Sequence, residues 1–245
     1  MKVVFKKPES MTTARMHYCP GCGHGIVHRL IAEVVDELGI QEQIIGIAPV
    51  GCAVLAYDYW DFDVSEAAHG RPPAVATGIK RVHPDKVVFT YQGDGDLASI
   101  GAAETLHAAN RGENISIIFI NNTVYGMTGG QMAPTTLLGQ RTTTTPAGRT
   151  TDFAGYPMKM SEILNAVDGA KYIERTAVDT PANIMKTKAA IKKSFKAQMD
   201  NKGFSMVEVL SMCPTNWGMT PIESAEHINK ELVKIFPLGV IKDEL

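Results

Sequence analysis

Short apolar runs alternate with segments of helical periodicity along most of this chain of 245 residues. Continuous apolar runs are typical of strands buried on both faces of a parallel sheet, and apolar residues spaced every three to four positions are typical of amphipathic helices. The predicted strands cover residues 44–48, 86–91, 115–121, 171–178 and 204–210, and the predicted helices cover residues 24–38, 73–82, 99–111, 161–167 and 180–200. We therefore predict an α/β fold with a doubly wound, mostly parallel sheet, in a single domain that covers residues 1–245.

The charge balance and the distribution of apolar residues exclude several classes of protein. Lys and Arg number 24 and Asp and Glu number 26, which leaves a formal net charge of −2 and no basic run for binding nucleic acid. No apolar run approaches the roughly 20 residues of a membrane-spanning helix, and the N-terminus lacks the apolar core of a secretory signal. We therefore expect a cytoplasmic protein with reduced cysteines, and we interpret the KDEL tetrapeptide at residues 242–245 as coincidence.

Two polar motifs follow neighbouring predicted strands. Residues 92–96 (QGDGD) come directly after one strand, and Asn121-Asn122 ends the next, with a gap of 25 residues that fits one helix and one strand. Ligands of parallel sheets bind beyond the carboxyl ends of the strands, so Asp94 and Asn122 can share one Mg²⁺ whose other ligands are diphosphate oxygens. Each motif alone is also typical of a tight turn or a loop cap, but their order and spacing favour a metal–diphosphate site.

Four cysteines follow the pattern C-x2-C-x29-C-x160-C, at Cys19, Cys22, Cys52 and Cys213. The first two lie in an N-terminal loop, and each of the others follows a predicted strand, so the four thiolates can meet at one edge of the sheet. A set of four cysteines suits Zn²⁺ or an iron–sulfur cluster. A thioredoxin-like Cys-Pro-Gly-Cys motif and unrelated buried thiols are the other readings that the residues leave open.

The motif GDG-x25-NN resembles the diphosphate-binding domain of thiamine diphosphate enzymes. Combined with the cysteines, it makes the chain similar to the β subunit of the 2-oxoacid:ferredoxin oxidoreductases, from Cys19 to Cys213. The matching motifs are CPGCGH at 19–24, HGR at 69–71, GDGDLASIG at 93–101, NNTVYGMTGGQ at 121–131 and CPTNW at 213–217.

This resemblance implies roles for several of the matched residues. The family's Mg²⁺ ligands fall on Asp94, Asn122 and the carbonyl of Val124. The residues expected to contact thiamine diphosphate are Gly93, Asp94, Gly95, Asp96, Asn122, Val124, Gly126, Met127 and Thr128. The expected ligands of a [4Fe–4S] cluster are Cys19, Cys22, Cys52 and Cys213. His69 and Arg71 are expected to contact thiamine or the substrate carboxylate, with a plain loop and helix-capping role as the alternative.

The resemblance also implies a reaction and partners. The family carries out the CoA-dependent oxidative decarboxylation of a 2-oxoacid to an acyl-CoA and CO₂, and passes electrons through the cluster to ferredoxin. A chain of 245 residues has no room for the second α/β unit that supplies a carboxylate to the thiamine pyrimidine. We therefore expect an α subunit that completes the site, together with γ and ferredoxin-like δ subunits and an external ferredoxin.

The choice of substrate rests on residues near the expected thiazolium position. Some relatives that accept 2-oxoglutarate carry a lysine where Gly129 stands, and Tyr125 and Met127 lie nearby in the sequence. This favours an apolar, branched-chain substrate such as 2-oxoisovalerate, with 2-oxoglutarate as the alternative. A non-oxidative thiamine decarboxylase or carboligase, or a zinc-stapled binding protein, would be different readings of the same chain, but the first leaves the four cysteines without a role.

Overall fold

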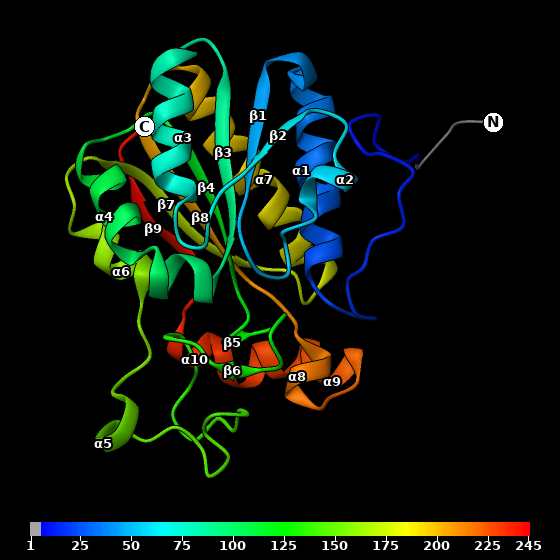
Figure 1. Ribbon diagram of the computed structural model, residues 1–245, viewed down its shortest axis with the longest axis vertical. Coiled ribbons are helices and arrows are strands. Elements are labelled where there is room, and N and C mark those ends of the chain that lie inside the picture. The colour runs from blue at the N-terminus through cyan, green and yellow to red at the C-terminus, as the bar shows by residue number, and fades with distance from the viewer. Residues whose placement is uncertain (1–5) are drawn as a thin grey trace.

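The computed structural model describes residues 6–245, and within them seven strands form one sheet in the order β2-β1-β3-β4-β8-β7-β9 (Figure 1). The strands are β1 (Ile44–Ala48), β2 (Asp63–Glu66), β3 (Val87–Gly93), β4 (Ser116–Asn121), β7 (Ala170–Ala177), β8 (Phe204–Leu210) and β9 (Gly239–Asp243). Neighbouring strands pair in parallel, except for β7 and β9, which are antiparallel. The predicted α/β class and the doubly wound, mostly parallel sheet are confirmed.

Helices cover both faces of the sheet (Figure 1). They are α1 (His24–Leu38), α3 (Pro72–Val82), α4 (Ala102–Asn110), α6 (Met160–Asn165) and α7 (Pro181–Met199). Residues of α1 and α7 share one apolar cluster with Phe89 and Tyr91 of β3, whereas α3, α4 and α6 share the other with Val88. Because side chains alternate along a strand, each predicted apolar run fills two cores at once. Within residues 6–245, no helix has both the length and the apolarity to cross a membrane.

The predicted elements are present, and three of them differ from expectation. Strand β3 continues through Gly93, and the chain then enters a π-helical segment at Gly95–Ile100, ahead of the helix that we predicted from residue 99. Residues 204–210 form the last strand that we predicted, and taking it as the final strand was wrong, because β9 follows it and pairs along β7. The edge strands β2 and β9 are largely exposed and polar, so neither shows the apolar run by which the central strands were found.

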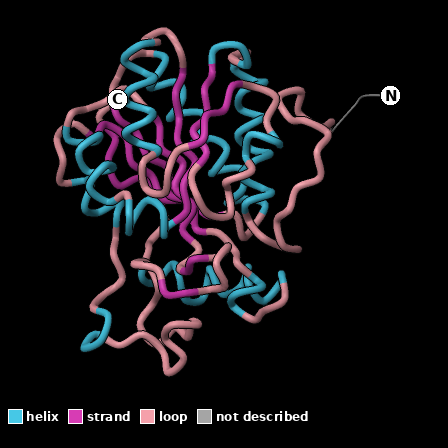
Figure 2. Tube along the Cα trace, viewed as in Figure 1, coloured by secondary structure: helices cyan, strands magenta, loops and turns pink. Residues whose placement is uncertain are grey.

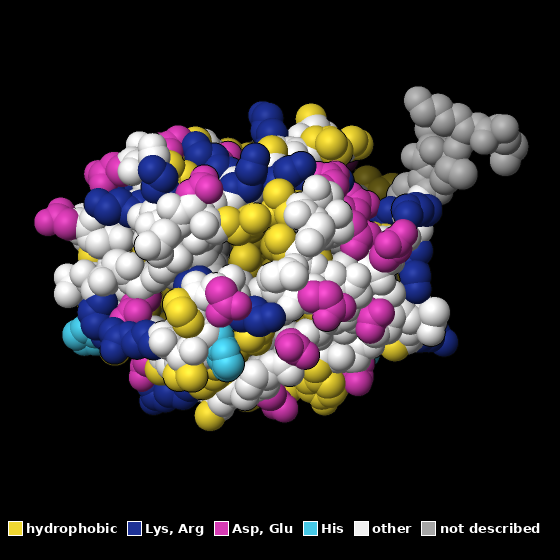
Figure 3. Space-filling view, turned by 90° about the horizontal axis from the view of Figure 1, so that it is seen from above, with side chains coloured by type: hydrophobic (Ala, Val, Ile, Leu, Met, Phe, Trp, Pro, Cys, Tyr) yellow, Lys and Arg dark blue, Asp and Glu magenta, His cyan; other side chains and the backbone are white. Residues whose placement is uncertain are grey.

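A separate layer lies beyond the carboxyl ends of the strands (Figures 1 and 2). It is formed by residues 122–158, which follow β4, and by residues 211–238, which follow β8. Its short elements are β5 (Val124–Tyr125), β6 (Gln131–Met132), α5 (Thr151–Ala154), α8 (Pro214–Trp217), α9 (Pro221–His227) and α10 (Val233–Ile235). At the opposite end of the molecule, shown in Figure 3, Lys and Arg side chains are interspersed with Asp and Glu, as the near-neutral charge leads one to expect.

The topology creates a crevice between β1 and β3. Strand β2 pairs on one side of β1, and β3 pairs on the other side. The order in which strands are added to the sheet therefore reverses between β1 and β3. In doubly wound sheets, ligands bind at such a switch point, outside the carboxyl ends of the strands. The loop after β1 carries Cys52 and the loop after β3 carries Asp94. The fold therefore brings the cysteine motif and the GDG motif to the same crevice.

A buried ion pair holds the strand that leads to the second motif. Glu208 of β8 accepts hydrogen bonds from Asn121 Nδ2 at 2.8 Å and from Arg175 Nε at 2.8 Å, and the Ser161 hydroxyl donates to the same carboxylate. Glu208 and Arg175 are each 1% exposed. Asn121, the first asparagine of the motif, is thus committed to the protein core, which leaves Asn122 to face the crevice.

We expect Arg175→Met to lower the free energy of unfolding by about 3–5 kcal/mol, because the Glu208 carboxylate would stay buried without its cation. Urea unfolding followed by circular dichroism measures this change. Lys193→Met is the matched control, since it breaks the partly exposed Lys193–Asp243 pair and should cost less than about 1 kcal/mol. An equally small loss for Arg175→Met would contradict the importance of the buried pair.

Candidate functional site

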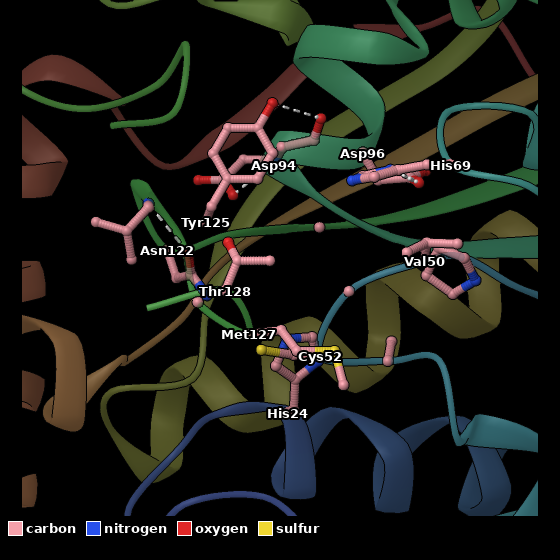
Figure 4. A pocket seen from close by; sticks show the side chains of 17 residues that line it. His24, Val50, Cys52, His69, Asp94, Asp96, Asn122, Tyr125, Met127 and Thr128 are labelled. Carbon is pink, nitrogen blue, oxygen red and sulfur yellow. Dashed lines mark hydrogen bonds and ion pairs between the residues drawn. The ribbon is translucent and has the colours of Figure 1, made fainter. Parts of the chain in front are cut away.

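A cavity of about 100 Å³ lies at the carboxyl ends of β1, β3 and β4 (Figure 4). The structure brings all nine residues predicted to contact a diphosphate cofactor into its wall. They are Gly93, Asp94, Gly95, Asp96, Asn122, Val124, Gly126, Met127 and Thr128. His24, Cys52, His69 and Tyr125 line the same cavity. The sequence motifs therefore meet in space as their spacing predicted.

Asp94 is the buried acid of this cavity. Its side chain is 2% exposed and accepts a hydrogen bond from Gly95 N at 2.9 Å and from the Thr135 hydroxyl at 2.7 Å. Burial raises the pKa of Asp94 to about 7, and these neutral donors only partly offset the rise. Asp94, Asn122 and Val124 line the same cavity, and Asn122 Oδ1 accepts a hydrogen bond from Val124 N at 3.2 Å. A carboxylate, an amide oxygen and a backbone carbonyl would make an all-oxygen donor set, which is the chemistry that Mg²⁺ prefers.

The turn that carries Asn122 and Val124 is strained. Thr123 lies between them with φ of 64°, a left-handed conformation that is costly for a β-branched residue. Three contacts hold Thr123 there: its N–H donates to Asn121 Oδ1 at 3.3 Å, Gln140 Nε2 donates to its hydroxyl at 2.8 Å, and the Thr136 hydroxyl donates to its carbonyl. Such strain is typical of functional sites, where the surrounding structure enforces it.

A tyrosine joins the two loops of the cavity. The Tyr125 ring packs so closely on Gly95 that a Cβ at residue 95 would lie 2.2 Å from Tyr125 Cε1. The Tyr125 hydroxyl also donates to the Gly95 carbonyl at 3.2 Å. The second glycine of the GDG motif is therefore required by close packing, and the loop after β4 is held directly against the loop after β3.

Asp96, which we predicted to contact the cofactor, is bonded to protein groups through both of its oxygens. Oδ1 contacts His69 Nδ1 at 2.6 Å and accepts from Gly70 N at 2.8 Å, while Oδ2 accepts from Gln92 Nε2 at 2.7 Å. An ionised carboxylate can only accept, so His69 Nδ1 carries the proton and Nε2 is left to the cavity that His69 lines. Figure 4 shows the Asp96 and His69 side chains pointing toward each other.

Arg71 lies outside the wall of this cavity. Its side chain is 48% exposed and forms an ion pair with Glu104 of α4. Arg71 is also the N-cap residue of α3. Its predicted contact with thiamine or the substrate carboxylate stays a prediction, whereas His69 has direct access to the cavity.

The four cysteines line a second cavity, of about 370 Å³. All four are free thiols, and burial raises the pKa of Cys22 and of Cys52 to about 12. Within residues 6–245, no group of three or more His, Cys, Asp or Glu side chains is placed to hold a single metal ion. Four cysteines that line one cavity are the donor chemistry of a zinc site or of an iron–sulfur cluster.

The two cavities share a wall. Cys52, Asn122, Gly126 and Met127 line both of them. A Cβ at residue 126 would lie 3.0 Å from Cys52 Sγ, so the loop after β4 touches the cysteine after β1. Two residues that support the first cavity were not among the predicted site residues. The Thr135 hydroxyl donates to Asp94 at 2.7 Å, and Trp217 Nε1 donates to the Asn122 carbonyl at 3.1 Å. Only the CPTNW motif pointed to Trp217, and nothing in the sequence pointed to Thr135.

Comparison with known proteins identifies the domain. Residues 50–209 match the family described as thiamine pyrophosphate enzyme, C-terminal TPP binding domain. The 2-oxoglutarate synthase subunit KorB of Methanocaldococcus jannaschii is 37% identical over 226 residues, which are 87% of this chain and 79% of that protein. The chain belongs to the thiamine diphosphate-binding subunits of the 2-oxoacid:ferredoxin oxidoreductases.

Two further relatives bear on the family. The ketoisovalerate oxidoreductase subunit VorA of Methanothermobacter thermautotrophicus is 51% identical over 240 residues, which are 98% of this chain. The chain spans half the length of that relative. A solved 2-oxoglutarate:ferredoxin oxidoreductase from Magnetococcus marinus, with 2-oxoglutarate, coenzyme A and succinyl-CoA bound, is 25% identical, has a TM-score of 0.81, and aligns with 98% of this chain and 85% of its own.

We expect Asp94→Ala to abolish binding of thiamine diphosphate with Mg²⁺, and Thr135→Val to weaken it by about tenfold or more. A hydrogen bond to a charged group contributes about 1.5–3 kcal/mol, and Thr135 donates one to Asp94. Calorimetric titration of the cofactor into the protein in its native complex measures both effects. Thr143→Val, at an exposed threonine, should change nothing. Wild-type affinity in Asp94→Ala would contradict the assigned site.

Proposed function

We propose that this chain is the β subunit of a 2-oxoacid:ferredoxin oxidoreductase. The reaction is the CoA-dependent oxidative decarboxylation of a 2-oxoacid to an acyl-CoA and CO₂, with the electrons leaving through a [4Fe–4S] cluster to ferredoxin. We call the cavity that contains Asp94 and Asn122 the thiamine cavity, and the cavity lined by the four cysteines the cysteine cavity. The observation that carries the proposal is the wall that these two cavities share at Cys52 and Gly126. Groups bound on either side of that wall would be neighbours, which suits direct electron transfer between them.

The residues present fit the groups that this function needs. Asp94, Asn122 and the Val124 carbonyl would hold Mg²⁺, while Gly93, Gly95, Gly126, Met127 and Thr128 would lie along thiamine diphosphate. Cys19, Cys22, Cys52 and Cys213 would hold the cluster, which accepts electrons one at a time. Thiamine diphosphate supplies an electron sink for decarboxylation when it is bound.

His69 is the group we assign to proton transfer in this cavity. The hydrogen bond from Nδ1 to Asp96 fixes the tautomer, so Nε2 can accept or return a proton on the cavity side. Gln92 Nε2 and Gly70 N hold the Asp96 carboxylate in place at 2.7 and 2.8 Å, and thereby orient His69. Arg71 would reach a substrate carboxylate only after leaving Glu104.

We propose partner subunits for the remaining parts of the site. The thiamine cavity holds about 100 Å³, whereas enclosed small-molecule sites have roughly 300–1,000 Å³, which supports a second wall contributed by an α subunit. Leu138, Phe153 and Tyr156 in the layer beyond the sheet are 48%, 78% and 75% exposed, as residues that contact a partner often are. A γ subunit, a ferredoxin-like δ subunit and an external ferredoxin complete the proposed electron path.

For the chain itself we propose a single domain that covers residues 1–245.

Thiolate-held iron suggests the compartment as well. Free cysteines and a cluster both require reducing conditions, so we propose a cytoplasmic location.

For the substrate we propose a branched-chain 2-oxoacid, with 2-oxoisovalerate as the first candidate. Within residues 6–245, neither cavity is lined by a Lys or Arg that could pair with the second carboxylate of 2-oxoglutarate. The apolar Met127 lines both cavities instead. The name of the relative that is 51% identical points the same way, and 2-oxoglutarate is the alternative that the KorB relative supports.

Iron and acid-labile sulfide analysis of the anaerobically prepared complex tests the proposed reaction type. We expect about four irons per chain and an electron paramagnetic resonance (EPR) signal after reduction. A single zinc, or protein without metal, would support the non-oxidative decarboxylase, the carboligase or the zinc-stapled binding protein, and would reject the oxidoreductase.

A panel of 2-oxoacids assayed with CoA and a viologen dye tests the substrate. We expect kcat/KM for 2-oxoisovalerate to exceed that for 2-oxoglutarate by at least about tenfold, because a second carboxylate without a cation partner costs more than about 1.4 kcal/mol in a partly buried site. Equal values, or a preference for 2-oxoglutarate, would show that a partner subunit supplies the missing cation.

A further inference from the structure

We propose that Asn216 is a positioning residue. It couples Cys213 in the cysteine cavity to the loop at residues 126–130, which lines the thiamine cavity. One side-chain amide would set both the electron affinity of the cluster and the position of the cofactor loop. The inference rests on the proposed function, in that it takes Cys213 as a cluster ligand. It concerns Asn216, to which neither the motifs nor the proposed function assigns a role.

The amide of Asn216 makes two hydrogen bonds to two different parts of the site. Nδ2 donates to the Gly126 carbonyl at 3.0 Å and to Cys213 Sγ at 3.2 Å. An asparagine amide has two N–H groups, so each bond can use its own hydrogen. The Gly126 carbonyl can only accept, which requires the nitrogen of the amide to face it and fixes the orientation of the side chain.

The cofactor loop is in contact with Asn216 at a second point. At Gly130, where φ is 79°, a Cβ would lie 2.9 Å from Asn216 Oδ1. The loop from Gly126 to Gly130 therefore wraps around the amide, with a hydrogen bond at one end and close packing at the other. A change in the shape of this side chain would displace the loop that lines the thiamine cavity.

The bond to Cys213 has an electrostatic consequence. Asn216 Nδ2 donates a hydrogen bond to Cys213 Sγ at 3.2 Å, and the Cys213 side chain is buried, so water does not compete with this donor. The same donor favours negative charge on the sulfur, and a cluster gains negative charge when it is reduced. Hydrogen bonds to the sulfurs are one of the means by which proteins set cluster potentials. The Asn216 amide should therefore make the cluster easier to reduce.

The neighbouring residue offers a matched control. Trp217 lies next to Asn216 in α8, and its Nε1 donates to the Asn122 carbonyl at 3.1 Å. This bond supports the thiamine cavity. In the part of the chain that the structure describes, the Trp217 side chain has no hydrogen bond to a cysteine, and the backbone N–H of Trp217 donates to the Cys213 carbonyl at 3.0 Å, a bond that phenylalanine would keep. Removing the Trp217 indole N–H should disturb the loop that lines the thiamine cavity, and the hydrogen bond from Asn216 to Cys213 Sγ should remain.

The experiment compares Asn216→Leu with Trp217→Phe in the native complex. Leucine has a similar size and no donor, so we expect a more negative cluster potential in EPR-monitored redox titration. The expected change is about tenfold in the one-electron equilibrium, or about 59 mV. We also expect the dissociation constant of thiamine diphosphate to rise several-fold. Trp217→Phe should raise that constant and leave the potential at the wild-type value. An unchanged potential in Asn216→Leu would overturn the proposal.

Spectroscopy of the wild-type complex covers the case in which Asn216→Leu fails to fold. Asparagine labelled with ¹⁵N in the side-chain amide should give a hyperfine coupling to the reduced cluster in pulsed EPR, since Asn216 Nδ2 bonds to a cluster sulfur. The absence of any such coupling would overturn the proposal. Wild-type protein without four irons and without a cluster signal would refute the proposed function itself, so the two failures are distinguishable.

Discussion

The parallel pairing of β1, β3, β4 and β8 is the constraint on which the rest of the molecule depends. Because these strands run in one direction, their carboxyl ends lie at one edge of the sheet, and the loops that follow them meet there. Residues as far apart in sequence as Cys52 and Cys213 thereby line one cavity. The two apolar cores fix the strand register, and with it the position of each loop.

The site at this edge concentrates groups that are unfavourable in isolation. Asp94 is a buried carboxylate with a pKa raised to about 7, Thr123 adopts a left-handed backbone, and Cys22 and Cys52 are half-buried thiols with raised pKa values. The costs at Asp94 and Thr123 are offset in part by hydrogen bonds from Thr135, Thr136 and Gln140 in the layer beyond the sheet. A cation would stabilise the Asp94 carboxylate, and iron would stabilise the cysteine thiolates. The local instability of the protein and its proposed chemistry thus have the same origin.

Glycines at two positions decide how closely the halves of the site approach. Gly95 allows the Tyr125 ring to lie against the loop after β3, and Gly126 allows the loop after β4 to lie against Cys52. A side chain at residue 126 would push the thiamine cavity away from the cysteine cavity. Since electron transfer weakens with distance, the shared wall at Gly126 matters as much to the proposed reaction as the ligands on either side.

The sequence by itself determined the central strands, the helices that cover them, and the positions of the GDG, NN and cysteine motifs. The strands and helices follow from apolar periodicity and the motifs from residues that are close in sequence, whereas the wider set of expected cofactor contacts came from the resemblance to a known family. Only the tertiary structure decided that Asp96 orients His69, that Arg71 pairs with Glu104, and that Thr135 and Asn216 support Asp94 and Cys213. These contacts join residues that are far apart in the sequence and follow no periodic pattern, or they depend on the side-chain rotamer. The exposed edge strands β2 and β9 escaped prediction because they need little apolar surface to pair.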